Sequence, residues 1–176
     1  MNDEDITKIT QNDSENIYKL DNQHVIRRTL MSLIYVATTK TSDDYAWTSI
    51  KKLINELKIN YDFLKYIKIK DIKQLRYSID DIIIEPNLNN IEPSEVGKAI
   101  QDIIDLLKKY LGKKAGYFFI QEFKEVLGEQ YHKIIKSMGV DLRLVELQDE
   151  LYGVNTGKYK IKDDSNSNIA YIEKVD

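Results

Sequence analysis

The most regular feature of this chain is an apolar ladder in its middle third. Its members fall at positions i, i+4, i+7, i+8, i+11 and i+15: Val96, Ile100, Ile103, Ile104, Leu107 and Leu111. That spacing gathers all six side chains on one face of an α-helix. Pro93 stands where a helix tolerates proline, and Gly112 follows the last apolar residue, where glycine commonly ends one. A helix of this kind must bury its stripe against other elements, so the ladder predicts a packed helical core.

Other segments repeat apolar residues at helical spacing. A first helix is expected from about Asn22 to Thr38 and a second after the turn Thr41–Asp44, with Thr41 as N-cap and Asp44 at N3. A long helix is expected over Ala115–Met138, with Gly139 at its end. A shorter helix, capped by Asp141, should run to about Tyr152.

Two neighbouring segments are harder to interpret. Residues 60–70 can form a short helix, although the alternation Ile67-Lys68-Ile69-Lys70 also fits an extended strand. We favour the helix. Asp71 is then expected to cap a further helix that Pro86 closes, and its apolar face would consist of Ile72, Leu75, Ile79, Ile82 and Ile83.

These elements predict an all-α fold of five to seven helices in an antiparallel bundle, because several connections are only a few residues long. The bundle should occupy residues 17–153. Residues 1–16 are polar and acidic and are expected to form a disordered tail. Residues 154–176 contain two alternating segments, 158–162 and 169–175, which predict a small C-terminal β-hairpin or a loose tail.

Composition excludes several classes of function. The 176 residues include no cysteine, which rules out disulfides, thiolate catalysis and cysteine-bound metal. The longest apolar run, Leu30–Ala37, is too short to span a bilayer, and the polar N-terminus does not resemble a secretion signal. We therefore expect a cytoplasmic protein that does not enter membranes.

The two histidines suggest a metal site that their positions do not favour. His24 and His132 each follow a carboxylate by three residues, Asp21 and Glu129, the spacing that di-iron helical bundles use. On a continuous helix, however, Glu129 and His132 would project away from the apolar stripe, and Asp21 is better placed as a cap. We expect no metal and no cofactor.

A basic, aromatic stretch suggests nucleic-acid binding as an alternative function. Lysines neutralise phosphates and aromatic rings stack on bases, yet arginine, the usual base reader, supplies only four of the 26 basic residues. An AT-rich coding sequence would also inflate lysine. The candidate residues are Lys51, Lys52, Lys58, Lys65, Lys68, Lys70, Lys73 and Arg76.

No catalytic motif stands out. Carboxylate pairs such as Asp80/Asp81, Asp102/Asp105 and Glu122/Glu125 fit polar helix faces and i,i+4 ion pairs better than acid–base chemistry. A glycine-rich phosphate loop is absent from the sequence. An enzyme is therefore not favoured, although a small-ligand sensor or a metal-dependent bundle enzyme remains a further alternative.

Two glycines and an aromatic cluster carry the remaining signals. Gly97 and Gly128 lie inside helical patterns, where glycine often allows another backbone to approach closely. Tyr117 and Phe118 project away from the stripe of the long helix, so they are candidate contacts for a partner. The sequence thus favours a non-catalytic interaction or regulatory module that binds a protein partner or a second copy of itself.

Overall fold

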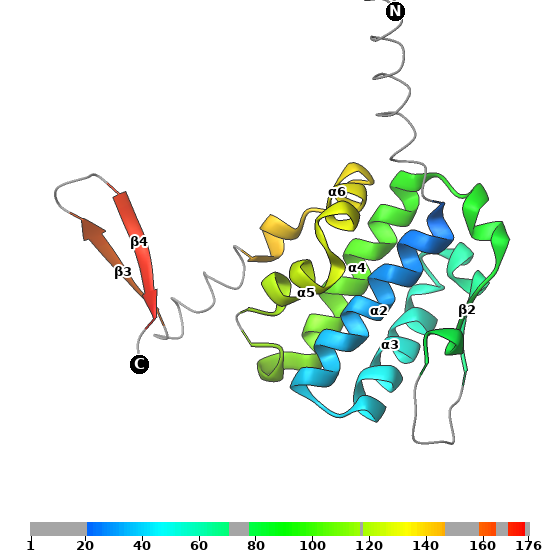
Figure 1. Ribbon diagram of the computed structural model, residues 1–176, viewed down its shortest axis with the longest axis horizontal. Coiled ribbons are helices and arrows are strands. Elements are labelled where there is room, and N and C mark those ends of the chain that lie inside the picture. The colour runs from blue at the N-terminus through cyan, green and yellow to red at the C-terminus, as the bar shows by residue number, and fades with distance from the viewer. Residues whose placement is uncertain (1–20, 71–77, 117, 147–158, 165–168, 175–176) are drawn as a thin grey trace, which may run out of the picture.

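The computed structural model describes residues 21–70, 78–116 and 118–146, and the backbone of residues 159–164 and 169–174. The fold is all-α with a small C-terminal antiparallel hairpin, as the sequence predicted, and with a second short strand pair that it did not predict (Figure 1). The α-helices are α2 (Asn22–Lys40), α3 (Asp43–Leu57), α4 (Pro93–Leu111), α5 (Phe119–Leu127) and α6 (Glu129–Ser137). Short 3-10 helices are η1 (Asp62–Tyr66), η2 (Ile79–Asp81), η3 (Pro86–Asn90) and η4 (Gly112–Lys114). The strands are β1 (Ile67–Ile69), β2 (Ile82–Ile84), β3 (Tyr159–Asp164) and β4 (Ile169–Lys174).

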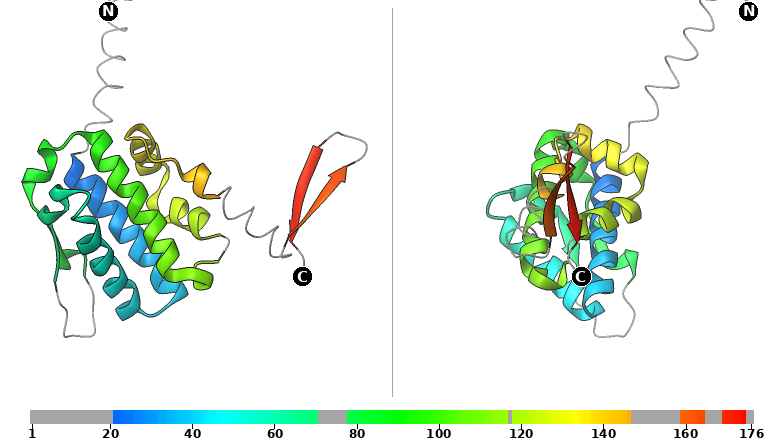
Figure 2. Two further views of the ribbon diagram at one scale, coloured as in Figure 1. Left: turned by 180° about the vertical axis from the view of Figure 1, so that it is seen from behind. Right: turned by 90° about the vertical axis from the view of Figure 1, so that its left-hand side faces the viewer.

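Helix α2 is the central element, and it packs against α3, α4, α5 and α6 (Figure 2). Tyr45 at the start of α3 donates a hydrogen bond to the carbonyl of Tyr110 at the end of α4, so these helices are antiparallel. Lys40 at the end of α2 pairs with Glu122 near the start of α5. Helices α2 and α4 begin at the same end of the bundle, since Asn22 bonds the carbonyl of Ile91 just before α4.

The apolar stripes that predicted the helices form one core. All six members of the Val96–Leu111 ladder are at most 3 % exposed. Phe119, Phe123 and Leu127 of α5 are fully buried against the same cluster. Because these side chains are close-packed, α2, α3, α4 and α5 form a rigid scaffold for the less regular parts of the chain.

Polar caps place the helix ends, with one correction to the sequence prediction. Asp21 caps α2 as expected and accepts a hydrogen bond from the His24 amide at 3.0 Å. The N-cap of α3 is Ser42, which accepts from the Tyr45 amide, and not Thr41. The Thr41 hydroxyl instead donates to the carbonyl of Ala37 at 2.8 Å and so satisfies the end of α2.

The predicted long helix over Ala115–Met138 is wrong. Gly128 has φ 87° and ψ 152°, a conformation open to glycine but costly for other residues, and there the chain turns from α5 into α6. The Gly128 N–H donates to the Lys124 carbonyl at the end of α5, and the Gly128 carbonyl accepts from the His132 N–H at the start of α6. The apolar spacing continues across this turn, which explains why the sequence resembled one helix.

The close approach expected at Gly97 and Gly128 is confirmed at Gly97 but is wrong at Gly128, where nothing lies within 4 Å of an added Cβ. A Cβ atom built on Gly97 would lie 2.0 Å from the carbonyl oxygen of Met138, directly after α6. Only a residue without a side chain allows α4 to meet the chain this closely. Asp141 then caps a helical segment as predicted, since its carboxylate accepts from the Arg143 and Leu144 amides.

Of the helices predicted between residues 60 and 85, the described residues keep only the short 3-10 helices η1 and η2, and the predicted helical faces at 67–69 and 82–84 are strands instead. A 3-10 turn leads into β1, which pairs in antiparallel fashion with β2 in the register Ile67↔Ile84, Lys68↔Ile83 and Ile69↔Ile82. Each strand contributes isoleucines, a β-branched residue that favours a pleated, half-buried surface. Residues 71–77, with the predicted cap Asp71, Ile72 and Leu75, lie outside the described residues.

Polar side chains on the first turns of α2 hold this irregular segment in place. Gln23 Nε2 donates to the Ile84 carbonyl and Arg27 Nη1 to the Ile82 carbonyl, each at 2.7 Å. Asn22, itself buried, donates to the carbonyls of Leu88 and Ile91 at 3.1 and 2.7 Å. Helix α2 therefore covers the outer edge of β2.

The chain ends fall largely outside the described residues. The predicted tail over residues 1–16 belongs there, and so do residues 147–158. Strands β3 and β4 pair from Tyr159↔Lys174 to Asp164↔Ile169, so the C-terminal segment forms a hairpin. Among the described helices, none combines the length and the apolar character needed to cross a membrane.

Candidate binding site at the β1 edge

Among the residues that the structure describes, no further strand pairs with the second edge of the small sheet, on β1. The bonds Lys70 N–H to Asp81 C=O and Glu85 N–H to Tyr66 C=O show that the pairs 66/85 and 70/81 are hydrogen-bonded. In an antiparallel ladder such pairs alternate with non-bonded ones, so the main-chain groups of Ile67 and Ile69 point away from β2. The Ile67 N–H bonds the Leu64 carbonyl, which leaves the Ile67 C=O and both groups of Ile69 facing outward.

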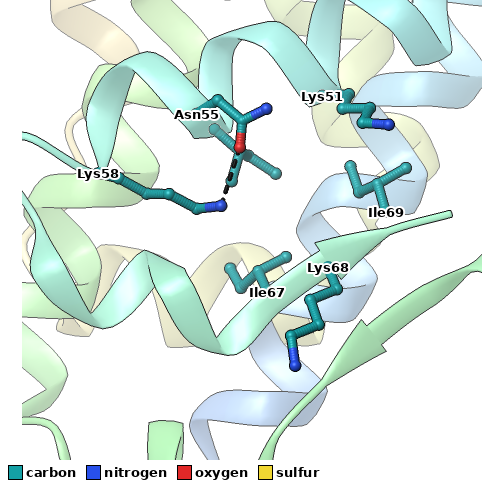
Figure 3. A pocket seen from close by; sticks show the side chains of 7 residues that line it. Lys51, Asn55, Lys58, Ile67, Lys68 and Ile69 are labelled. Carbon is teal, nitrogen blue, oxygen red and sulfur yellow. Dashed lines mark hydrogen bonds between the residues drawn. The ribbon is translucent and has the colours of Figure 1, made fainter. Parts of the chain in front are cut away.

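A hollow of about 160 Å³ lies between this edge and α3. Figure 3 shows α3 on one side of the hollow and β1 on the other, with β2 beyond β1. The buried side chains of Ile54 and Ile67 give it an apolar floor, and Ile69 is half-buried beside them. The residues that line it are Lys51, Ile54, Asn55, Lys58, Ile67, Lys68 and Ile69.

The polar rim of the hollow is entirely cationic or neutral. Lys51 and Lys58 come from one face of α3, and Lys68 comes from the exposed face of β1. Lys58 donates to the side-chain oxygen of Asn55 at 2.8 Å, and Lys68 pairs with Glu85 at 2.6 Å. None of the seven lining residues carries a carboxylate, so basic and amide groups surround the apolar base, and Lys68 is paired with the Glu85 carboxylate beside it.

The fold distributes the basic stretch over several surfaces. Lys52 lies 5.1 Å from the centre of the Tyr110 ring and within 3.8 Å of Glu56, away from the hollow lining. Lys65 pairs with Asp62, and Lys70 lies 3.9 Å from Asp81. Lys73 and Arg76 lie outside the described residues. Of the described candidates, Lys51, Lys58 and Lys68 line the hollow, with Lys51 and Lys58 on the α3 side and the Lys68 side chain directed away from α3 (Figure 3).

The predicted aromatic contact lies at the other end of the bundle. Phe118 is 54 % exposed, directly before α5, whereas Tyr117 lies outside the described residues. Tyr45 at the start of α3 is 41 % exposed, with Lys114 5.3 Å from its ring centre. Singly exposed aromatics of this kind are common on protein surfaces, and neither Phe118 nor Tyr45 lines the hollow at β1.

The histidine constellation does not converge. Glu129 is exposed and pairs with Lys133 at 2.7 Å, which lowers the pKa of its carboxyl group. His132 is half-buried, and its burial, together with Lys124 and Lys136, lowers the pKa of its ring. His24 binds the capping carboxylate of Asp21 at 2.7 Å. Across residues 21–70, 78–116 and 118–146, no three histidines or carboxylates gather in a way that could hold a metal ion.

The carboxylate pairs have structural partners. Asp102 accepts from the Tyr61 hydroxyl at 2.8 Å, and burial together with this carboxylate raises the pKa of Tyr61 to about 12. Partial burial raises the pKa of Asp105, whose carboxylate lies 3.5 Å from the Gln101 amide. Asp81 accepts from the Ser78 amide at 2.7 Å. Of these contacts, the Tyr61–Asp102 bond joins distant segments of the fold, and the other two lie within one helix and one turn.

Sequence reasoning did not single out Ile54, Asn55, Ile67 or Ile69 as site residues. The alternation of residues 67–70 was the available signal, because an extended reading of it would have suggested a strand edge. The alternation alone could not identify the partner strand β2, which begins fifteen residues after the start of β1.

Comparison with known proteins finds no family model, no curated protein and no solved structure that matches this chain.

Proposed function

We propose that this chain is a non-catalytic protein-interaction module that binds an extended segment of a partner by strand addition at β1. The observation that supports it is the main-chain edge of Ile67 and Ile69, with which no described strand pairs and which lies beside the apolar hollow at α3. In strand addition, main-chain hydrogen bonds to such an edge supply the affinity, and adjacent pockets select the side chains of the added segment. On this proposal the bundle serves as the rigid support for a short recognition edge.

The size of the hollow favours a peptide over a drug-sized ligand. Pockets for small molecules and cofactors usually enclose roughly 300–1,000 Å³. At about 160 Å³, the hollow at β1 suits one or two side chains of a strand that otherwise remains in solvent. The acidic side chains discussed above are engaged in structural contacts, and this also favours binding over catalysis.

The binding should be weak and reversible. The edge offers three main-chain groups, and each hydrogen bond contributes about 0.5–1.5 kcal/mol net. Lys68 in the middle of so short a strand also discourages indiscriminate pairing with other strand edges. A dissociation constant in the micromolar range or weaker is expected, which suits a regulatory contact.

The experiment removes one main-chain donor while preserving the fold. In Ile69→Pro the outward N–H is lost, and proline is tolerated at sheet edges where that group has no internal partner. Ile69→Val keeps the donor and serves as the matched control. Peptides selected from a random displayed library against the full chain would be tested on both variants by titration calorimetry and amide NMR.

Strand addition predicts that selected peptides shift the amide signals of residues 67–69, slow hydrogen exchange at Ile69, and lose most of their affinity for Ile69→Pro but not for Ile69→Val. Circular dichroism and thermal unfolding check that the proline variant retains the fold. Peptides that bind with undiminished affinity to Ile69→Pro, or that shift only signals around Phe118, would overturn the proposal.

A further inference from the structure

Resting on the proposed function, a second step concerns what kind of segment the β1 edge accepts. We propose that the partner segment is acidic and extended, with aspartate or glutamate alternating with aliphatic residues. The inference follows from Lys68 on the exposed face of β1, two buried isoleucines on its other side, Lys58 across the hollow, and a strand edge with which no described strand pairs.

The inward positions of the added strand should be aliphatic. Side chains alternate across a strand, and neighbours in adjacent strands share a face. In β1, Ile67 points into the core and Ile69 is half-buried on the same side. Residues of the partner beside these two would therefore point toward the floor formed with Ile54, where a polar side chain would lose its hydration.

The outward position between them should carry a negative charge. It lies beside Lys68, whose cross-strand neighbour in β2 is Ile83, 42 % exposed and uncharged. Opposite charges at such positions attract and like charges repel. In the ion pair of Lys68 with Glu85 the lysine is exposed and the glutamate half-buried, and pairs near solvent contribute little, so an incoming carboxylate can share the lysine with Glu85. Lys58, which donates to the uncharged Asn55 side chain, adds positive charge on the α3 side.

Two other occupants fit the same surface less well. A second copy of this chain paired edge to edge would bring Lys68, Lys51 and Lys58 against their own equivalents. Single-stranded nucleic acid would meet the positive charge but not an aromatic stacking platform, because no aromatic residue lines the hollow. Charge and shape together favour an acidic segment with aliphatic side chains.

The test uses four labelled peptides of equal length with the full chain. One alternates valine with glutamate, one valine with serine and one valine with lysine. The fourth has the composition of the first but groups its valines and glutamates into blocks. Binding is measured by fluorescence anisotropy at low and at physiological salt, and the site is located from the NMR signals of residues 67–69.

The alternating valine–glutamate peptide is expected to bind at least tenfold more tightly than the valine–serine peptide, and the advantage should shrink with salt. The block peptide and the valine–lysine peptide should bind more weakly than either. Lys68→Glu should reverse the preference toward the lysine peptide. Lys98→Glu is the matched control, since Lys98 has the same degree of exposure and pairs with Glu95 at 2.7 Å elsewhere.

The outcomes separate this inference from the function on which it rests. If the serine peptide binds at residues 67–69 as tightly as the glutamate peptide, the acidic preference is wrong and strand addition stands. If no peptide perturbs residues 67–69, strand addition itself fails. An oligothymidine that displaces the acidic peptide from wild type, or a peptide-free dimer that Lys68→Glu dissociates, would overturn the acidic segment in favour of nucleic acid or a second copy.

Discussion

The helical scaffold and the segment between α3 and α4 differ in how their structure is determined. Helices α2, α3 and α4 are specified locally, because each apolar side chain has neighbours three and four residues away on the same face. The segment from η1 to η3 depends on distant partners: β1 needs β2, and β2 needs side chains of α2 more than fifty residues earlier. The candidate site lies in the second kind of structure and is supported by the first.

The largest effect is expected from a change inside the scaffold, Gly97→Ala. Alanine normally stabilises a helix relative to glycine by about 1 kcal/mol. Here its Cβ would meet the Met138 carbonyl oxygen at 2.0 Å, so α4 and the end of α6 must separate. We expect a loss of about 3 kcal/mol in the free energy of unfolding, measured by urea denaturation. Ser94→Ala, on the exposed face of the same helix, should change it by less than about 0.5 kcal/mol. Equal stabilities of the two variants would contradict the close approach.

A smaller and more local effect is expected from Asn22→Ala. The buried amide satisfies the carbonyls of Leu88 and Ile91, and its removal leaves both without that donor. We expect a loss of about 2–3 kcal/mol, with hydrogen exchange accelerated first around η3 and the β1–β2 pair. Asn90→Ala removes an exposed amide from the same 3-10 helix and is the control. If exchange instead accelerated uniformly over α3 and α4, the contrast between scaffold and segment would be wrong.

Most of the scaffold could be predicted from the sequence, because the ladder of α4, the aspartate cap of α2 and the glycine after Leu111 are local signals. The β1–β2 pair could not, since the isoleucine spacing around residues 67–69 and 82–84 fits a helix and a strand equally well. The candidate site was predicted only in part. Lys51, Lys58 and Lys68 were singled out within a larger basic stretch, but the hollow that unites them depends on that unpredicted pairing.

Gly128→Ala tests the one place in the scaffold where local spacing was misleading. No atom lies within 4 Å of the position that a Cβ would occupy, so the cost is backbone strain alone, at φ 87°. We expect a loss of about 1–2 kcal/mol in thermal or urea unfolding. Gln130→Ala, exposed in the first turn of α6, should be nearly neutral. A stabilised Gly128→Ala would indicate that α5 and α6 readily join into the single helix that the sequence suggested.

The smallest effect is expected from the titration of His132, which adjoins the packed scaffold yet stays partly accessible. Its burial, with Lys124 and Lys136 nearby, disfavours the protonated ring, so its pKa is lower in the folded chain than in the unfolded one. The unfolded chain then binds the proton first as the pH falls below about 6.5. Stability owed to the neutral ring is therefore present above that pH and is lost as the pH falls toward the folded pKa.

His132→Gln should lose less stability than wild type between pH 7.5 and 5, measured by urea unfolding, and the two curves should run parallel above pH 7.5. Glu129 and Glu146 act on the ring in the opposite direction, because they favour its protonated form. If wild type instead lost less stability than His132→Gln between pH 7.5 and 5, these carboxylates would outweigh the burial and the lysines.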